Sequence, residues 1–493
     1  MELFIQIIIP VIAAFIAVNW SYFKILRIAK EKKIVDAPDS RKLQRSPVPV
    51  LGGIAVFFGM VVGVLMGAAV QPWLHTAPIG FLLPVFCIAM LMLYTGAMDD
   101  MTGLSPLSRF AIEILTLLCV IFATGLCADQ LNGLWGLGKI TWWVAVPLTV
   151  FSGVGIINAI NMIDGVNGLS SGLCILCSIL FGLAFLLVGD GVNAMLAFTV
   201  ASALVPFFFH NVFGNRSRMF IGDAGTMMMG VLLTWFVIVL INGDIAPWQK
   251  AFGHEVNLIA LALAILSVPI FDTIRVMFLR ILQKKSPFHP DKTHLHHVFV
   301  RMGVSHTITA IVEITLDLII VGVWALLVHW GVSVDGQLYL IIAISLLFVW
   351  GLYFVLHRQE ELHTELMHRL TRLSIKTHYG NTRWWQRLEH WLDGPEAENV
   401  TVTEAEAKPV MTVEEFYHFD NIDPNNLKEQ DRKLLYDFIK GKAEVYVDDI
   451  KNRSGANALR VDVLIDEGII DGFIMTVKEG VWGAPMIVTL KEK

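Results

Sequence analysis

The chain has 493 residues, of which 55% are hydrophobic and only 16% are charged, and its formal net charge is −6. Soluble globular proteins carry about 25% charged residues, so this composition excludes an ordinary soluble fold. The apolar residues fall into blocks of about 18 or more, the length that a helix needs to cross a bilayer. We therefore expect an all-α polytopic membrane protein with about eleven transmembrane helices.

The expected spans follow one another from residue 3 to residue 357. They lie near 3–24, 50–70, 79–98, 108–128, 140–160, 169–188, 193–212, 222–242, 256–279, 307–329 and 337–357. The first span has no basic residue before it, whereas Lys24 and Arg27 come at its end, so the positive-inside rule places the N-terminus outside. The loops then expected in the cytoplasm, which hold most of the basic residues, are 25–49, 99–107, 161–168, 213–221 and 280–306.

The chain after the last span is expected to be cytoplasmic and to have three parts. Residues 358–393 form an amphipathic helix, in which Trp384, Trp385 and Trp391 are interleaved with basic residues. This helix either lies along the lipid headgroups or packs as a solvated helix before the tail. A polar linker at 394–410 follows the membrane domain (1–357) and this helix.

Residues 411–493 are expected to form a small α/β module. Helices predicted within 431–467 and a hairpin of 473–477 with 486–490 resemble a winged helix-turn-helix. The module has 11 basic against 16 acidic residues, whereas a reader of nucleic acid needs a basic face. Nucleic acid is therefore not the expected partner, and a regulatory or protein-docking role is favoured.

Two acids, Asp99 and Asp100, end the third span. Adjacent side chains on a helix point about 100° apart, so one carboxylate can act as a base while the other helps to hold a cation. A pair of solvated acids at the end of a span is the alternative.

A run of polar residues and glycines ends the fifth span, with the sequence Asn158-Ala-Ile-Asn161-Met-Ile-Asp164-Gly-Val-Asn167-Gly168. Asn158 and Asn161 share one helical face, which Asp164 continues. Amide and carboxylate oxygens are the ligands of a Mg²⁺ that also binds phosphates. Helix capping and a turn explain one Asn and one Gly but not the whole run.

The eighth span opens with Gly222-Asp223-Ala-Gly225, directly after Phe220. N–H groups and the helix dipole favour anions at such a position, and Phe220 offers a face on which a base can stack. Capping of its own helix by Asp223 is the alternative.

A histidine-rich stretch, 289–297, follows the ninth span and contains His294, His296 and His297 beside Lys292. Its spacing matches no common zinc pattern, and its side chains suit phosphate or sugar hydroxyls better; a solvated loop is the alternative. The first cytoplasmic loop ends in Arg45-Ser-Pro-Val-Pro-Val-Leu-Gly-Gly53, whose basic residue suits anionic headgroups or a diphosphate.

These motifs, with Arg109 after the paired acids, occur in the order found in the polyprenyl-phosphate N-acetylhexosamine-1-phosphate transferases, and residues 25–305 resemble that family. Within it the chain resembles the bacterial undecaprenyl-phosphate GlcNAc-1-phosphate transferases. The branch that transfers phospho-MurNAc-pentapeptide typically has three consecutive histidines, whereas this chain has His294-Leu-His296-His297.

The resemblance implies Mg²⁺ as the cofactor, with Mn²⁺ as an alternative, and places the protein in the bacterial cytoplasmic membrane. It implies UDP-N-acetylhexosamine and undecaprenyl phosphate as substrates, membrane lipids as neighbours, and leaves a homodimer open. It implies that Asp99 and Asp100 are catalytic, that Asn161 and Asp223 hold the metal, and that Arg45, Arg109, Asp164, Asn167, Phe220, His294, His296 and His297 bind substrate. Whether Asp99 is a base or a covalent nucleophile stays open.

Two other classes of function are alternatives to a transferase. A transporter of lipid-linked sugars needs charges near the bilayer midplane and broken helices, whereas the acids here lie at the ends of spans on one side. A membrane scaffold, whose cytoplasmic module recruits a partner, can coexist with an enzyme.

Overall fold

The computed structural model describes residues 2–36, 48–70, 79–287, 293–302, 304–361 and 382–398, together with four strands near the C-terminus. It has two compact units, Met1–Val402 and Thr403–Lys493. The helices and strands of the first unit are α1 (Glu2–Glu31), β1 (Val35–Asp36), β2 (Val48–Pro49), α2 (Gly52–Val70), η2 (Ile79–Phe81), α3 (Leu82–Thr102), α4 (Pro106–Thr124), η3 (Leu134–Gly136), α5 (Trp142–Met162), α6 (Leu169–Leu187), α7 (Gly191–Phe213), α8 (Gly222–Asn242), α9 (Ala246–Phe252), α10 (Leu258–Ile265), α11 (Ser267–Leu282), α12 (Leu295–Arg301), α13 (His306–His329), α14 (Val334–Ser345), η4 (Leu346–Gly351), α15 (Leu352–Glu361) and α17 (Arg383–Glu398).

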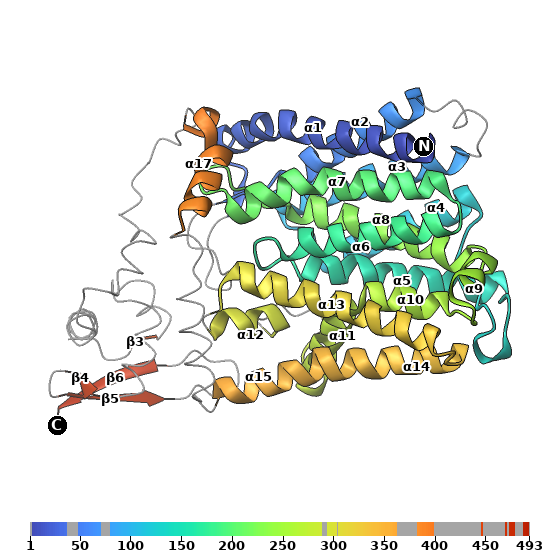
Figure 1. Cartoon of the computed structure of the whole chain (residues 1–493). Coiled ribbons are helices and arrows are strands. Elements are labelled where there is room, and N and C mark those ends of the chain that lie inside the picture. The colour runs from blue at the N-terminus through green and yellow to red at the C-terminus, as the bar shows by residue number, and fades with distance from the viewer. Residues whose placement is uncertain are drawn as a thin grey trace. The chain divides into compact units, whose positions relative to one another are not determined.

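Long apolar helices run side by side through the first unit (Figure 1). Among the described residues, 10 helices are long and apolar enough to cross a membrane, and the bent pair α10 and α11 raises the number to 11 if it is one span. Large apolar side chains such as Leu83, Phe151 and Leu347 point outward, as expected where lipid replaces water around a bundle. The predicted all-α polytopic membrane fold is therefore confirmed.

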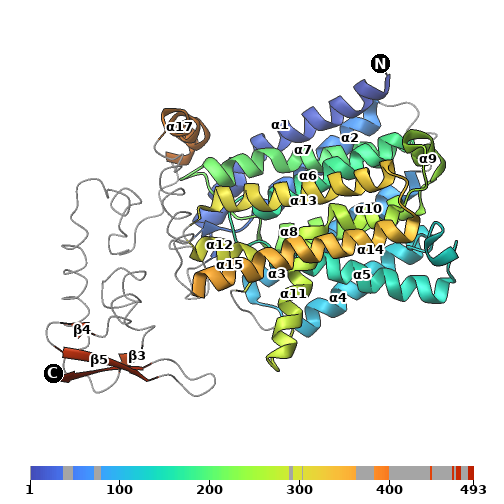
Figure 2. The same cartoon turned by 60° about the horizontal axis from the view of Figure 1, so that its bottom comes forward.

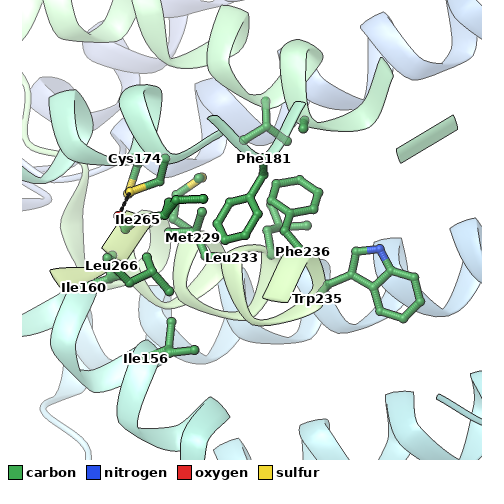
Figure 3. Packing of buried hydrophobic residues seen from close by; sticks show 14 of the residues in the cluster. Ile156, Ile160, Cys174, Phe181, Met229, Leu233, Trp235, Phe236, Ile265 and Leu266 are labelled. Atoms are coloured by element: carbon green, nitrogen blue, oxygen red, sulfur yellow. Dashed lines mark hydrogen bonds between the residues drawn. The ribbon is translucent and has the colours of Figure 1, made fainter. Parts of the chain in front are cut away.

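Helix α8 lies at the centre of the bundle, with 94% of its apolar window buried inside the protein. It packs against α3 and α5, and its residues Met229, Leu233 and Phe236 contribute to the apolar core drawn in Figure 3. A Cβ on Gly230 would come within 2.5 Å of the Cα of Ile157, so glycine is needed for this close helix contact. Because α8 lies at the centre of the bundle, the residues at its N-terminus are held in place by the surrounding helices.

The ninth span is broken, which differs from the continuous helix expected over 256–279. Helices α10 and α11 meet at an angle of 76°. Pro269 has no N–H to donate to the carbonyl of Ile265, four residues earlier, and the thiol of Cys177 donates to this carbonyl instead, at 3.1 Å. The carboxylate of Asp317 accepts from the N–H of Val268 at 3.1 Å. These partners satisfy the groups that the break exposes; Figure 3 shows Ile265 at this position.

The second unit contains an antiparallel sheet with the strand order β3-β6-β5-β4, formed by Val445–Tyr446, Ile487–Glu492, Phe473–Lys478 and Ile469–Ile470. β5 and β6 lie where the sequence predicts the two strands of a hairpin, and they pair from Phe473 with Glu492 to Lys478 with Ile487. The helices predicted within 431–467 lie outside the described residues. The winged-helix interpretation stays a prediction.

The predicted amphipathic segment is represented by two pieces. α15 continues the last span to Glu361, and α17 extends to Glu398, into the expected linker. The residues between them, 362–381, lie outside the described part of the chain. The three boundaries between the four predicted parts stay predictions.

Candidate active site

The first turn of α8 binds the carboxylate of Asp100, which belongs to α3. The N–H groups of Asp223 and Ala224 donate to the two carboxylate oxygens of Asp100 at 3.0 and 3.3 Å. Free N–H groups and the helix dipole stabilise an anion in this position. The N-cap is Ile221 and makes no side-chain cap, so Asp223 does not cap its own helix. Asp100 fills the anion position at this end of α8.

The close approach of α3 and α8 depends on glycine. A Cβ on Gly96 would collide with the backbone of Asp223 and Ala224, and Gly222 has φ +72°, in the left-handed region that favours glycine. A Cβ on Gly222 would also lie 2.5 Å from an oxygen of Asp100. Glycine at these two positions lets the paired acids reach the N-terminus of α8.

The two adjacent acids accept hydrogen bonds from different N–H groups, although the charges of both interact with that of Asp223. Asp99 accepts from the N–H of Leu104 at 2.7 Å and lies 3.4 Å from Nη1 of Arg109. Arg109 also pairs with Glu113 at 3.3 Å, and Glu113 accepts from the amide of Asn158 at 2.6 Å. A series of hydrogen-bonded polar side chains therefore connects α3, α4 and α5. Glu113 was not predicted from the sequence, although an acid four residues after Arg109 inside an apolar span was a usable signal.

The polar run at the end of α5 meets the start of α8. Nδ2 of Asn161 donates to Asp223 at 2.6 Å and to the hydroxyl of Thr226 at 2.8 Å. Asp164 accepts from the hydroxyl of Ser170 at 2.5 Å, and its charge interacts with that of Asp223. The structure therefore brings together the residues that the resemblance assigns to the metal.

These oxygen-bearing side chains do not form a closed metal cage. Within the part of the chain that the structure describes, no group of three or more His, Cys, Asp or Glu is arranged to hold a metal ion. The charges of Asp100, Asp164 and Asp223 interact with one another, and Arg109 forms its ion pairs with Asp99 and Glu113. The site has hard oxygen ligands and a surplus of negative charge.

The turn after α5 packs against the histidine segment. The N–H of Asn167 donates to Nδ1 of His306 at 3.4 Å. A Cβ on Gly165 would lie 2.6 Å from Nε2 of His296, so only glycine lets the turn approach this ring. His297 lies beside His296, with ring centroids 4.3 Å apart. Two of the histidines predicted to bind substrate, His296 and His297, therefore lie beside the turn that follows Asp164.

His296 is fully buried, and neither ring nitrogen has a hydrogen-bond partner among the described residues. Burial lowers the pKa of His296 well below its ordinary value, and the neighbouring rings of His297 and His294 lower it further. The ring is therefore neutral at physiological pH.

Asp272 holds the start of the histidine segment in place. It accepts from Nδ1 of His294 at 2.7 Å, from the N–H of Leu295 at 3.1 Å and from Arg275 at 2.7 Å. Arg275 lies over the ring of Tyr353, 3.4 Å from its centroid. Sequence reasoning missed Asp272 and Arg275, although opposite charges three residues apart inside an apolar span were a usable signal.

The proline-rich end of the first loop pairs with the segment that precedes α8. The N–H of Phe220 donates to the carbonyl of Pro49 at 2.7 Å, and the N–H groups of Gly52 and Gly53 donate to Phe220 and Ile221 at 3.0 Å each. Two motifs far apart in the sequence thus form one wall of the site. Arg45 lies outside the described residues.

An apolar cavity of about 640 Å³ borders the polar side chains that connect α4 and α5. α4, α5, α8, α10 and α11 line it, and along α5 the lining runs from Leu148 to Ala159, about 16 Å at the rise of an α-helix. Asn158, which bonds Glu113, belongs to this lining. The cavity is therefore a membrane-embedded slot with a polar group from the site in its wall.

The sequence profile of glycosyl transferase family 4 matches residues 82–241, which include both acids of α3 and the start of α8. A probable undecaprenyl-phosphate N-acetylglucosaminyl 1-phosphate transferase of Bacillus subtilis is 31% identical over 316 residues, covering 63% of this chain and 82% of the relative. Undecaprenyl-phosphate alpha-N-acetylglucosaminyl 1-phosphate transferases of Yersinia pestis (30% identical, 59% and 75% covered) and Escherichia coli K12 (26%, 69% and 89%) are also similar. The chain is therefore an enzyme of glycosyl transferase family 4 and belongs to the polyprenyl-phosphate N-acetylhexosamine-1-phosphate transferases.

Proposed function

We propose that the enzyme transfers GlcNAc-1-phosphate from UDP-GlcNAc to undecaprenyl phosphate, releases UMP and so initiates a lipid-linked surface glycan. The relatives above are named for transfer to undecaprenyl phosphate. The observation that carries the proposal is the contact between Asn161, Asp223 and Asp100, next to an apolar slot within the membrane unit. A water-soluble diphosphate and a lipid phosphate can meet at such a place.

The reaction exchanges one phosphoryl partner for another. An oxygen of the lipid phosphate attacks the β-phosphorus of UDP-GlcNAc, a new P–O bond forms, and the bond to the bridging oxygen breaks to release UMP. Asp99 is the base candidate because its carboxylate faces Arg109 at 3.4 Å, whereas the carboxylate of Asp100 is occupied by N–H groups of α8. Arg109 is placed to bind the phosphate that Asp99 deprotonates.

The ligand chemistry of the site fits Mg²⁺. This ion is usually held by one or two carboxylates together with substrate phosphates, so a protein cage of three acids is not required. Asp223 and Asn161 would hold it, with Asp100 beside them. Bound there, Mg²⁺ screens the charge between two anionic substrates and stabilises the leaving phosphate.

The slot lined by α4, α5, α8, α10 and α11 suits the acceptor's hydrocarbon tail. Its lining is apolar apart from a few side chains such as Asn158 and Thr273. Because Asn158 bonds Glu113 and Glu113 bonds Arg109, the slot leads to the group that would bind the lipid phosphate.

The positive-inside rule supports a site on the cytoplasmic side of the bacterial inner membrane with the N-terminus outside. UDP-sugars are cytoplasmic, so the donor is available on this side.

The test uses the purified full-length protein with Mg²⁺, undecaprenyl phosphate and a panel of UDP-sugars that includes UDP-MurNAc-pentapeptide. We expect UMP and lipid-diphosphate product from UDP-GlcNAc. Asp223→Ala should abolish both, whereas Asp244→Ala, an exposed acid beyond the other end of α8, should not. Product from UDP-MurNAc-pentapeptide alone would refute the donor, and an active Asp223→Ala enzyme would refute the metal assignment.

A further inference from the structure

Helix α17, which follows the last membrane span, is fixed to the loop between α7 and α8. The carboxylate of Asp393 accepts from the N–H groups of Asn215, Arg216 and Ser217 at 3.0 to 3.1 Å, and from the hydroxyl of Ser217 at 2.7 Å. Four donors thus converge on one carboxylate, and hydrogen bonds to an ionised acceptor are stronger than those between neutral groups.

An apolar contact between α17 and α7 adds to these hydrogen bonds. The ring of Trp385 lies 4.7 Å from that of Phe213, the last residue of α7, and Leu392 is buried on the same face of α17. Trp385 and Leu392 are seven residues apart and therefore share one face of the helix. Figures 1 and 2 both show α17 next to the end of α7.

Helix α1 also holds this loop. The hydroxyl of Tyr22 donates to the carbonyl of Ser217 at 2.9 Å, and Nζ of Lys30 donates to the carbonyl of Arg216 at 2.8 Å. Nδ1 of His210 lies 3.1 Å from Oγ of Ser217. Ser217 is therefore clamped between the membrane domain and α17.

The clamped loop leads directly into the candidate active site. Two residues after Ser217, the carbonyl of Met219 accepts from Asn211 at 3.0 Å, and Asn211 accepts from the N–H of Gly168 at 2.7 Å. Phe220 then pairs with Pro49, and Asp223 lies six residues from Ser217 in the sequence. A shift of the loop would move the residues that face the nucleotide and the metal.

We propose that Asp393 is a positioning residue: by clamping the α7–α8 loop, α17 holds Phe220 and Asp223 in the geometry that transfer requires. The proposal rests on the proposed function for its kinetic consequence, but not for the clamp itself. The motifs that carry the family resemblance end near residue 305, so they do not assign this role. α17 also connects the membrane unit to the second unit, which begins at Thr403.

The charge state of Asp393 fits this role. Burial alone would raise the pKa of Asp393, but the N–H groups of Arg216 and Ser217 and the hydroxyl of Ser217 outweigh it, so the pKa lies below its ordinary value. The clamp therefore keeps its negative charge at neutral pH.

The test compares Asp393→Asn with Gln386→Ala in the full-length protein; Gln386 is exposed on the same helix. Hydrogen exchange should accelerate at the amides of 215–217, and also in the following segment through Asp223, by about tenfold or more, as expected for loss of a charge-assisted hydrogen bond. The KM for UDP-GlcNAc should rise by a similar factor while the melting temperature stays close to that of the wild type. Gln386→Ala should match the wild type in all three measurements.

The outcomes separate the two proposals. Faster exchange at 215–217 with unchanged exchange at 220–223 and unchanged kinetics would overturn the positioning role. A wild-type protein without activity on UDP-GlcNAc would refute the proposed function, while the exchange data would still decide the clamp. Where Asp393→Asn does not yield folded protein, Ser217→Ala tests the same contact by removing one donor, and unaltered exchange and KM in that variant would count against the clamp.

Discussion

Replacement of Gly53 by alanine probes how closely α2 must approach α8. A Cβ on Gly53 would lie 2.5 Å from both Cα and N of Gly225, whereas carbon atoms pack favourably at about 3.5–4.0 Å. The two backbones must therefore separate by about 1 Å. Because both contacting atoms belong to the backbone, no change of side-chain rotamer can relieve the contact.

This separation would displace active-site residues, because Gly225 lies two residues after Asp223 in the first turn of α8. A misplacement of 1 Å can reduce a rate by about 100-fold, which corresponds to about 2.7 kcal/mol in the activation barrier. We therefore expect Gly53→Ala to lower kcat by about that factor while the protein still inserts and purifies as a folded species.

The assay is UMP release at saturating UDP-GlcNAc and undecaprenyl phosphate, with thermal unfolding measured in parallel. Gly322→Ala is the matched control, because a Cβ there would meet no atom within 4 Å. A Gly53→Ala enzyme with the kcat of the wild type would show that the start of α8 tolerates displacement, and the geometric argument for the site would fail.

Three further predictions concern catalysis, the cofactor and pH. Asp99→Asn should lose turnover yet still bind UDP-GlcNAc in a titration, because it leaves Asn161 and Asp223, the residues proposed to hold the metal, unchanged; normal turnover would remove its role as a base. Removal of divalent cations with EDTA should stop transfer and added Mg²⁺ should restore it, and EDTA-resistant transfer would contradict the proposed cofactor. His296 has a lowered pKa in the folded protein, so below about pH 6.5 the unfolded state binds the extra proton and stability falls, by up to about 1.4 kcal/mol per pH unit. Melting temperatures of His296→Gln should decline less between about pH 6.5 and 5, and parallel profiles would refute this assignment.

Much of the fold could be predicted because each span is a local property of the sequence. The length and hydrophobicity of a segment decide whether it can cross a bilayer, so the predicted and observed spans agree over most of the chain. The break in the ninth span could not be predicted in this way. Pro269 permits a break, but the angle of the break depends on partners such as Cys177 and Asp317 on other helices.

Sequence reasoning found the site's residue types but not all of its contacts. Acids at the ends of apolar helices are costly unless they have a function, which is why Asp99, Asp164 and Asp223 could be singled out. Glu113 and Asp272 were missed because their partners, Asn158 and the start of the histidine segment, are distant in the sequence.

The sequence by itself determined that this chain is a polytopic membrane protein with four polar clusters at the ends of its helices, because hydrophobic length and residue chemistry are local. Only the tertiary structure decided that the carboxylate of Asp100 occupies the N-terminus of α8, from 123 positions away, and that Asp393 clamps the loop that leads there. Such contacts depend on how helices pack in three dimensions, and a linear pattern does not specify that packing.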